Sequence, residues 1–209
     1  MSVKKSFVLT LTAGLVGLLS AVSQPVFAAS SACGGASCTT GPVNLDFQVV
    51  IPAIVRLQIG DPTTTAQIVF DMNSTPALVG DSSAVSGTGG DVGGGEVTVK
   101  VLANGAATSV QVDADVSGGT SGIACTGGGC TPGTHWLAWD QISVTSGTFA
   151  CSVTPPVLDN NSTGSATYPA NAGGVVNEQC SWRYTYLNDQ VPVNGTYGGM
   201  VTYTATVTP

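Results

Sequence analysis

The chain has 209 residues and a formal net charge of −7, and it is 43% hydrophobic and only 8% charged. Five basic residues against twelve acidic ones exclude the basic surface that nucleic acids require and the polybasic patch that anionic lipids require. Low charge with high hydrophobicity also excludes the disordered class of chains. The 28 glycines, together with many Thr, Ser and Val residues, are typical of short strands joined by tight turns.

The N-terminal stretch has the organisation of a secretory signal peptide. Two lysines come first, an apolar run follows over residues 7–22, and Ala28 provides a small residue for cleavage. The apolar run is shorter than the roughly 20 residues that a membrane span needs. We therefore expect residues 1–28 to be a signal peptide. Residues 29–209 are then expected to form a single β-sandwich domain without a membrane span, secreted to the periplasm, cell surface or extracellular space.

Six cysteines follow this segment, and an even number in a secreted chain indicates disulfides. We predict that sequence neighbours pair, so that two pairs close small Gly-rich loops and the third closes a longer polar insert. The longer loop contributes more stability, because closing it removes more chain entropy. Zinc is not expected, because four residues rather than two separate the cysteines of each short pair. The predicted pairs are Cys33–Cys38, Cys125–Cys130 and Cys151–Cys180.

An alternating apolar segment opens the secreted part, at residues 43–51. Its polar residues share one face and five apolar residues share the other, which is typical of a strand. Pro52 interrupts the pattern, because proline cannot donate to a strand ladder, and the alternation resumes at residues 55–59. The pattern predicts one long strand with a break, or two strands that act separately. The five apolar residues are Val43, Leu45, Phe47, Val49 and Ile51.

The stretches 96–102 and 108–116 both alternate, and Asn104-Gly105 lies between them. Asn-Gly between alternating runs strongly favours a β-hairpin, so we predict that these two strands pair. The Gly/Ser/Asp-rich residues 80–95 are expected to form a loop with no packing potential.

The strand pattern of the remaining chain indicates the fold class. No segment after residue 28 has a helical period, and residues 155–174 are predicted to be a polar loop. Short strands with turn signals at these spacings predict an all-β fold, an Ig-like antiparallel β-sandwich of about nine strands containing disulfides. Further strands are expected at 67–71, 135–144, 148–153, 181–187 and 201–207. The predicted core residues are Phe47, Leu57, Val99, Val112, Trp182, Tyr184 and Val201.

Chemistry-bearing patterns are absent from the sequence. The one histidine, His135, has no G-x-S-x-G context, so we do not expect an enzyme, and no cofactor or metal is expected. Asp113 and Asp115 alternate along one strand and are interpreted as its solvated face. Trp136 and Trp139 cannot share a face of one strand. One is therefore predicted to be core and the other to be a platform for a sugar or a neighbouring subunit.

The final stretch, residues 195–208, is the most informative. From Val201 to Val207 apolar and threonine residues alternate without a break, which predicts a half-buried strand. With no chain after Pro209 to cover it, this terminal strand is expected to have a free edge.

This closing stretch resembles the last strand of chaperone–usher pilus subunits, above all those of the archaic, spore-coat-U type. The resemblance implies an incomplete Ig-like sandwich whose gap is filled by the N-terminal strand of a neighbouring subunit. It also implies related subunits and a periplasmic chaperone as partners. The matching residues are Gly195, Thr196, Tyr197, Val201, Tyr203, Ala205 and Val207.

Two function classes follow from these observations. The first is a secreted structural subunit of a bacterial surface filament or coat, such as a fimbrium, that assembles by β-strand complementation. In that case residues 43–51 leave their own sandwich and complete the sandwich of a neighbour beside Val201–Val207, although they could instead pair within their own domain. The alternative is a self-contained secreted β-sandwich that binds carbohydrate or cell wall.

Overall fold

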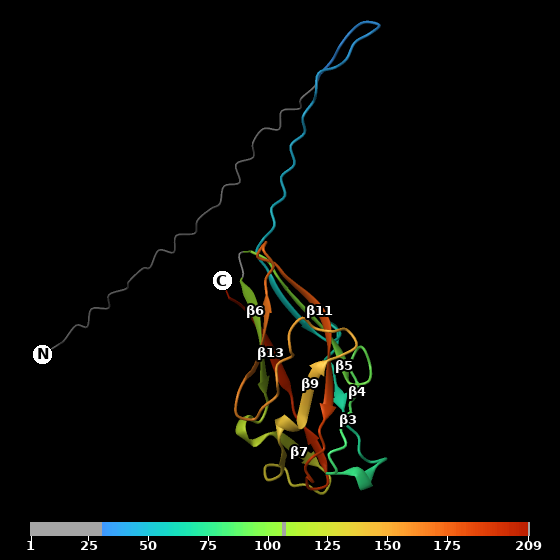
Figure 1. The fold of residues 1–209 in the computed structure, drawn as a ribbon, viewed down its shortest axis with the longest axis vertical. Coiled ribbons are helices and arrows are strands. Elements are labelled where there is room, and N and C mark those ends of the chain that lie inside the picture. Colours follow the sequence, from blue (N-terminus) through green and yellow to red (C-terminus); the bar gives the residue numbers. More distant parts are fainter. Residues whose placement is uncertain (1–30, 106–107, 209) are drawn as a thin grey trace, which may run out of the picture. The chain divides into compact units, whose positions relative to one another are not determined.

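The computed structural model describes residues 31–105 and 108–208. The chain divides into two units, Met1–Val50 and Ile51–Pro209, and all the assigned strands belong to the second (Figure 1). The expected signal peptide, 1–28, lies outside the described residues. Within the described ranges, no helix is both long enough and apolar enough to cross a membrane.

Thirteen strands and three short 3-10 helices are assigned in the described part of the chain. The first six strands are β1 (Val55–Ile59), β2 (Ile68–Val69), β3 (Val85–Ser86), β4 (Thr88–Gly89), β5 (Glu96–Ala103) and β6 (Ser109–Val116). The remaining strands are β7 (Ile123–Gly127), β8 (Trp136–Leu137), β9 (Ile142–Ser146), β10 (Gly164–Pro169), β11 (Val176–Tyr186), β12 (Thr196–Gly198) and β13 (Val201–Thr208). The 3-10 helices are η1 (Pro76–Leu78), η2 (Gly119–Ser121) and η3 (Trp139–Gln141).

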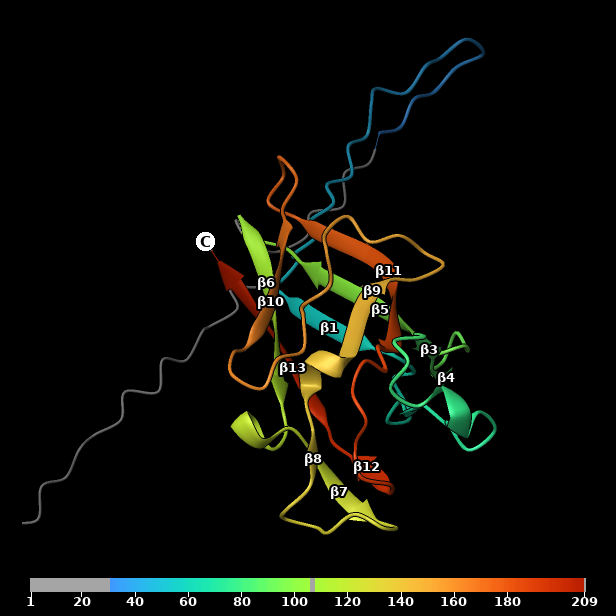
Figure 2. The ribbon, with the colours of Figure 1, turned by 60° about the horizontal axis from the view of Figure 1, so that its bottom comes forward.

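Two antiparallel sheets pack face to face (Figure 2). The first has the order β1-β5-β11-β3, with β9 also paired to β11, and the second has the order β10-β6-β13. Two smaller sheets, β12-β7-β8 and β2-β4, are also present. The predicted all-β, disulfide-containing sandwich is therefore confirmed, with more and shorter strands than expected.

The core lies between the two sheets because β5, β6 and most of β11 bury alternate side chains. Of the predicted core residues, Val99, Val112, Trp182 and Tyr184 are buried. Leu57 and Val201 are half-buried and pack against the same cluster. The prediction for Phe47 is wrong, because its side chain is 85% exposed. The structure also assigns no strand to residues 43–51.

The predicted hairpin is wrong although both of its strands exist. β5 pairs with β1 and β11, whereas β6 pairs with β10 and β13, so the two strands lie in opposite sheets. Alternation gives each strand one apolar face, and such faces suit two strands that face each other across a core as well as two that pair side by side. Asn104-Gly105 thus connects two sheets.

Four other expectations about strands and loops differ from the structure. The predicted loop 80–95 contains β3, which pairs with β11, and β4, and Val85 of β3 packs against the core. Residues 135–144 contain β8, η3 and the start of β9 instead of one strand. Residues 148–153 form no strand, since hydrogen bonds of Thr148 and Phe149 to β5 and β11 side chains hold this stretch as a loop. The predicted loop 155–174 contains β10, which pairs with β6.

The basic residues after residue 28 all lie inside paired strands of the first sheet. Arg56 of β1 is opposite Leu102 of β5. Lys100 of β5 has partners on both sides, in β1 and in β11. Arg183 of β11 likewise pairs with β5 and β9. Each of these residues is therefore held in extended backbone at the sheet.

Candidate strand-addition site

The last strand, β13, has one paired edge and one unpaired edge. It pairs with β6 from Val201, opposite Val116, to Thr208, opposite Ser109. Among the strands of the described residues, none pairs with its other edge. β1 is in the same position, since β5 is its one strand partner there. Each of these strands therefore presents an edge where backbone N–H and C=O groups can accept a further strand.

These two unpaired edges belong to opposite sheets and lie close to each other (Figure 2). We call them together the β1–β13 seam. Along the seam, alternate apolar side chains are half-buried and pack against the core instead of being covered completely. The aromatic ring of Tyr203 lies 5.3 Å from that of Trp182, which is fully buried. The half-buried seam residues are Leu57, Ile59, Val201, Tyr203, Ala205 and Val207.

The segment 43–51 carries the complementary feature. Its five alternating apolar side chains are exposed, from 53% for Val43 to 85% for Phe47. No strand is assigned to any residue of this segment. Large apolar side chains that remain together in water mark an interaction site. The alternation is therefore that of a strand, although the segment has no strand partner in the described chain.

In contrast, the connection from β9 to β10 is anchored firmly across the sandwich. It buries Pro155 and Pro156, and Leu158 joins the core. The Cys151–Cys180 disulfide ties it to β11, and the Ser152 N–H donates to the Glu178 carboxylate at 2.7 Å. Among the described strands, β9 and β10 also have one partner each, but this connection places buried side chains against the core on their side, whereas the apolar side chains of the β1–β13 seam are only half-buried.

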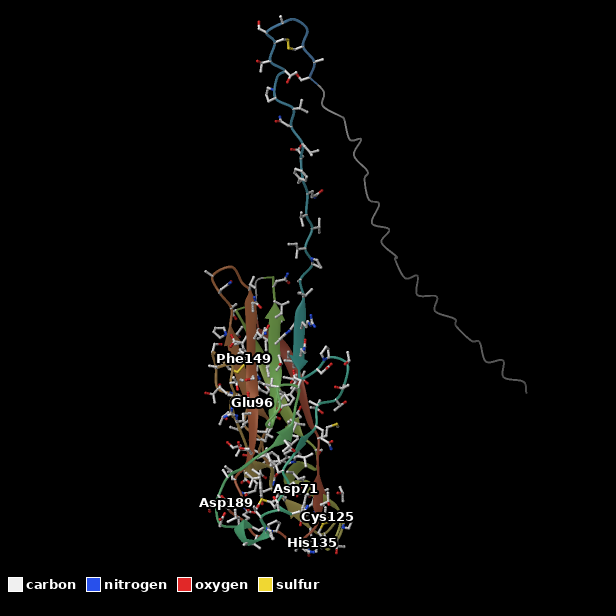
Figure 3. The ribbon with its side chains drawn as sticks, turned by 90° about the vertical axis from the view of Figure 1, so that its right-hand side faces the viewer. Asp71, Glu96, Cys125, His135, Phe149 and Asp189 are labelled. Atoms are coloured by element: carbon white, nitrogen blue, oxygen red, sulfur yellow. A yellow bond between two sulfur atoms is a disulfide. The ribbon has the colours of Figure 1, made fainter. Side chains whose placement is uncertain are left out.

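A buried carboxylate anchors the start of this connection (Figure 3). Glu96 is only 3% exposed. It accepts hydrogen bonds from the Thr148 N–H at 2.8 Å, the Ser181 hydroxyl at 3.1 Å and Arg183 Nε at 2.7 Å. Burial raises the pKa of this carboxyl, but the hydrogen bonds from Thr148, Arg183 and Ser181 outweigh it and lower the pKa. The neighbouring side chain of Phe149 remains 60% exposed.

Glu96 is a site residue that the sequence pattern did not indicate. An acidic residue at the start of a strand that alternates toward a core is the signal that could have drawn attention to it. Its partners come from residues far along the chain, so the sequence gives no indication of the cluster itself.

The three disulfides pair sequence neighbours, as predicted. The Cα–Cα distances are 5.9 Å for Cys33–Cys38, 6.0 Å for Cys125–Cys130 and 5.0 Å for Cys151–Cys180. Every cysteine of the chain is used. Such pairing indicates an extracytoplasmic compartment, because the cytosol keeps thiols reduced.

The two tryptophans that could serve as a platform have different environments. Trp139 is buried and its Nε1–H donates to the Ser117 carbonyl at 2.8 Å. Trp136 is 38% exposed. The neighbouring His135 uses Nδ1 to accept the Thr131 N–H at 2.8 Å, so this ring organises its own turn. Asp113 and Asp115 lie on β6, away from the core side chains of that strand.

The fold and the seam define a class of protein, an all-β, disulfide-linked sandwich with an unpaired strand edge on each of its two main sheets. No model of a known protein family matches the chain, and no curated protein matches it. The function is therefore inferred from the seam, the exposed segment and the disulfides.

Proposed function

We propose that the protein is a secreted structural subunit of a bacterial surface filament or coat that assembles by β-strand complementation. The observation that supports this function is that one chain has both an unpaired seam and an exposed segment with the alternation of a strand. A free edge recruits a further strand, and an added strand brings backbone hydrogen bonds and side chains that fill pockets. In this proposal, residues 43–51 of a second copy complete the sandwich at the β1–β13 seam.

The apolar face of the segment supplies enough free energy for a lasting contact. Burial of its five alternating side chains contributes about 7.5–10 kcal/mol, at roughly 1.5–2 kcal/mol each, before ordering costs. On the opposite face, Asn44, Asp46 and Gln48 stay in water. The segment then matches β13, whose threonines are exposed while its apolar side chains face the core.

The proposed contact is head to tail, because the segment and the seam are different surfaces. Such a heterologous contact forms an open filament unless its rotation happens to close a ring. Before a second copy arrives, the seam would need temporary cover. A periplasmic chaperone that lends a strand fits this need, in keeping with the resemblance to pilus subunits.

The decisive experiment compares two charge substitutions within the segment. Phe47→Asp places a charge on the inserting face, so we expect monomers of normal stability that bind an added 43–51 peptide but do not polymerise. Val50→Asp is the matched control, because Val50 is equally apolar and 81% exposed but lies on the other face; it should polymerise. Size-exclusion chromatography and electron microscopy of residues 29–209, with and without residues 29–52, provide the measurement. Equal polymerisation of both variants, or unfolding of Phe47→Asp that no peptide rescues, would contradict the proposal.

A second candidate function is a self-contained module that binds carbohydrate or cell wall, with Trp136 as its platform. The partial exposure of this indole favours it, because a ring face can stack on a sugar. In that case the purified protein stays monomeric with residues 29–52 present, and Trp136→Ala abolishes its retention on a polysaccharide column. Polymerisation through the segment would favour the first function instead.

A further inference from the structure

One asparagine holds the residues that join the exposed segment to the sandwich. The Ile54 N–H donates to Asn104 Oδ1 at 2.7 Å, and the Asn104 backbone N–H donates to the Ile54 carbonyl at 3.1 Å. The side-chain amide of Asn104 also donates to the Pro52 carbonyl at 3.1 Å. A single side chain therefore uses both its acceptor and its donor on residues that are 50 and 52 positions away in the sequence.

The turn that contains Asn104 comes very close to the same residues. Gly105 has a φ of +90°, and a Cβ added to it would lie 3.1 Å from Ala53 Cβ. Among the described non-glycine residues, only Ser82 and Asn188 have a positive φ. Asn104 is therefore not required for a left-handed backbone, which is the usual reason for Asn in an Asn-Gly turn. Its side-chain hydrogen bonds explain its presence better.

We propose that Asn104 is a positioning residue that fixes the connector, Pro52–Ile54, to the sandwich. The exposed segment 43–51 then ends at a defined residue, Ile51, and the loss of structure does not extend into β1. This inference rests on the proposed function for its second consequence. In a filament, the connector is the stretch between the strand inserted into one copy and β1 of its own copy, so a fixed connector makes the joint between consecutive copies stiff.

The first test uses the monomer, in the Phe47→Asp background. Asn104→Ala should accelerate amide hydrogen exchange at Ile54 by on the order of tenfold, the effect expected from the loss of about one net hydrogen bond. Asn104→Asp keeps the acceptor for the Ile54 N–H but loses the donor to the Pro52 carbonyl, so protection of Ile54 should lie between that of Asn104→Ala and the wild type. The matched control is Asn160→Ala, which removes an asparagine that accepts the Trp139 N–H at 2.8 Å; it should leave Ile54 unchanged. Unchanged exchange at Ile54 in Asn104→Ala would overturn the inference.

The second test measures the joint in filaments that carry wild-type Phe47. Asn104→Ala filaments should show a broader spread of bending angles in electron micrographs than Asn160→Ala filaments. An equal spread would overturn the stiff joint. If the wild-type protein forms no filaments, the proposed function fails, while the exchange at Ile54 still decides whether Asn104 fixes the connector.

Discussion

The hydroxyl of Tyr203 on β13 lies 2.8 Å from the hydroxyl of Tyr184 on β11. These strands belong to different sheets, so the hydroxyl pair links the two layers directly beneath the seam. The apolar faces of the two rings pack in the core while their polar ends satisfy each other. β13, which has one unpaired edge, is therefore attached to the core by its side chains as well as by its pairing with β6.

We predict that Tyr203→Phe destabilises the monomer by about 1–3 kcal/mol, because it leaves the buried Tyr184 hydroxyl without its partner. Urea denaturation followed by tryptophan fluorescence measures this difference. Tyr197→Phe is the control, since the Tyr197 hydroxyl donates to the Val193 carbonyl at a more exposed position and its loss should cost less. Equal stability of Tyr203→Phe and the wild type would show that the hydroxyl pair contributes nothing.

Two buried tyrosines, Tyr203 and Tyr168, predict a loss of stability in alkali. Burial raises the pKa of Tyr203 to about 12, and burial likewise raises the pKa of Tyr168 to about 12, from an ordinary value of 10.0. A raised pKa means that the folded state favours the neutral phenol. Stability should therefore be complete below pH 10 and fall as the pH rises toward 12. Denaturation midpoints across this range test the prediction, and Tyr203→Phe should show a shallower decline.

At the acid end, we expect Glu96 to make the opposite contribution. Its pKa is lowered from 4.5, so the carboxylate stabilises the fold above that pH, and this contribution is lost as the pH falls through the folded-state pKa. Glu96→Gln should cost about 1–3 kcal/mol at neutral pH and flatten the acid limb of the stability curve. The control is Asp140→Asn, at an exposed acidic residue, which should change neither quantity.

Removal of single disulfides should rank them by loop size. The Cys151–Cys180 pair is separated by 29 positions and the Cys125–Cys130 pair by 5. Loop-closure entropy then predicts a cost of about 3–4 kcal/mol for the first pair and about 2 kcal/mol for the second. Double Cys→Ala variants of each pair, compared by urea denaturation, provide the measurement. A larger loss for the 125–130 variant would indicate that local strain or packing outweighs chain entropy.

The sequence predicted individual strands well where alternation was long. β13, β5 and β6 were expected within one or two residues of their bounds, and the short sequence separations favoured the correct disulfide pairs. β10 was missed because its buried face consists of Gly164, Ala166 and Tyr168. Only one of these side chains is large, so the strand shows no clear apolar alternation in the sequence. Long strands can be recognised from the alternation of their own residues. The formation of a short strand depends on its partner elsewhere in the chain.

The sequence could not predict which strands pair with each other. The alternation around Asn104 is the same whether the flanking strands pair or face each other, and only the partners of β5 (β1 and β11) and of β6 (β10 and β13) distinguish the two. Phe47 shows the same limit of the sequence pattern. The alternation around Phe47 predicts that its side chain packs against a core, but it does not indicate which core. The seam was foreseen as the free edge of the last strand, but the matching free edge of β1 was not.

The placement of the basic residues makes trypsin a reporter of unfolding. Trypsin needs an extended, detached stretch around a Lys or Arg, and Arg56, Lys100 and Arg183 all lie within paired strands. Cleavage after any of them requires the first sheet to open, and for Lys100 and Arg183 this means separation from neighbours on both sides. The folded protein should therefore survive in tryptic environments, and its rate of digestion should follow the population of the opened sheet.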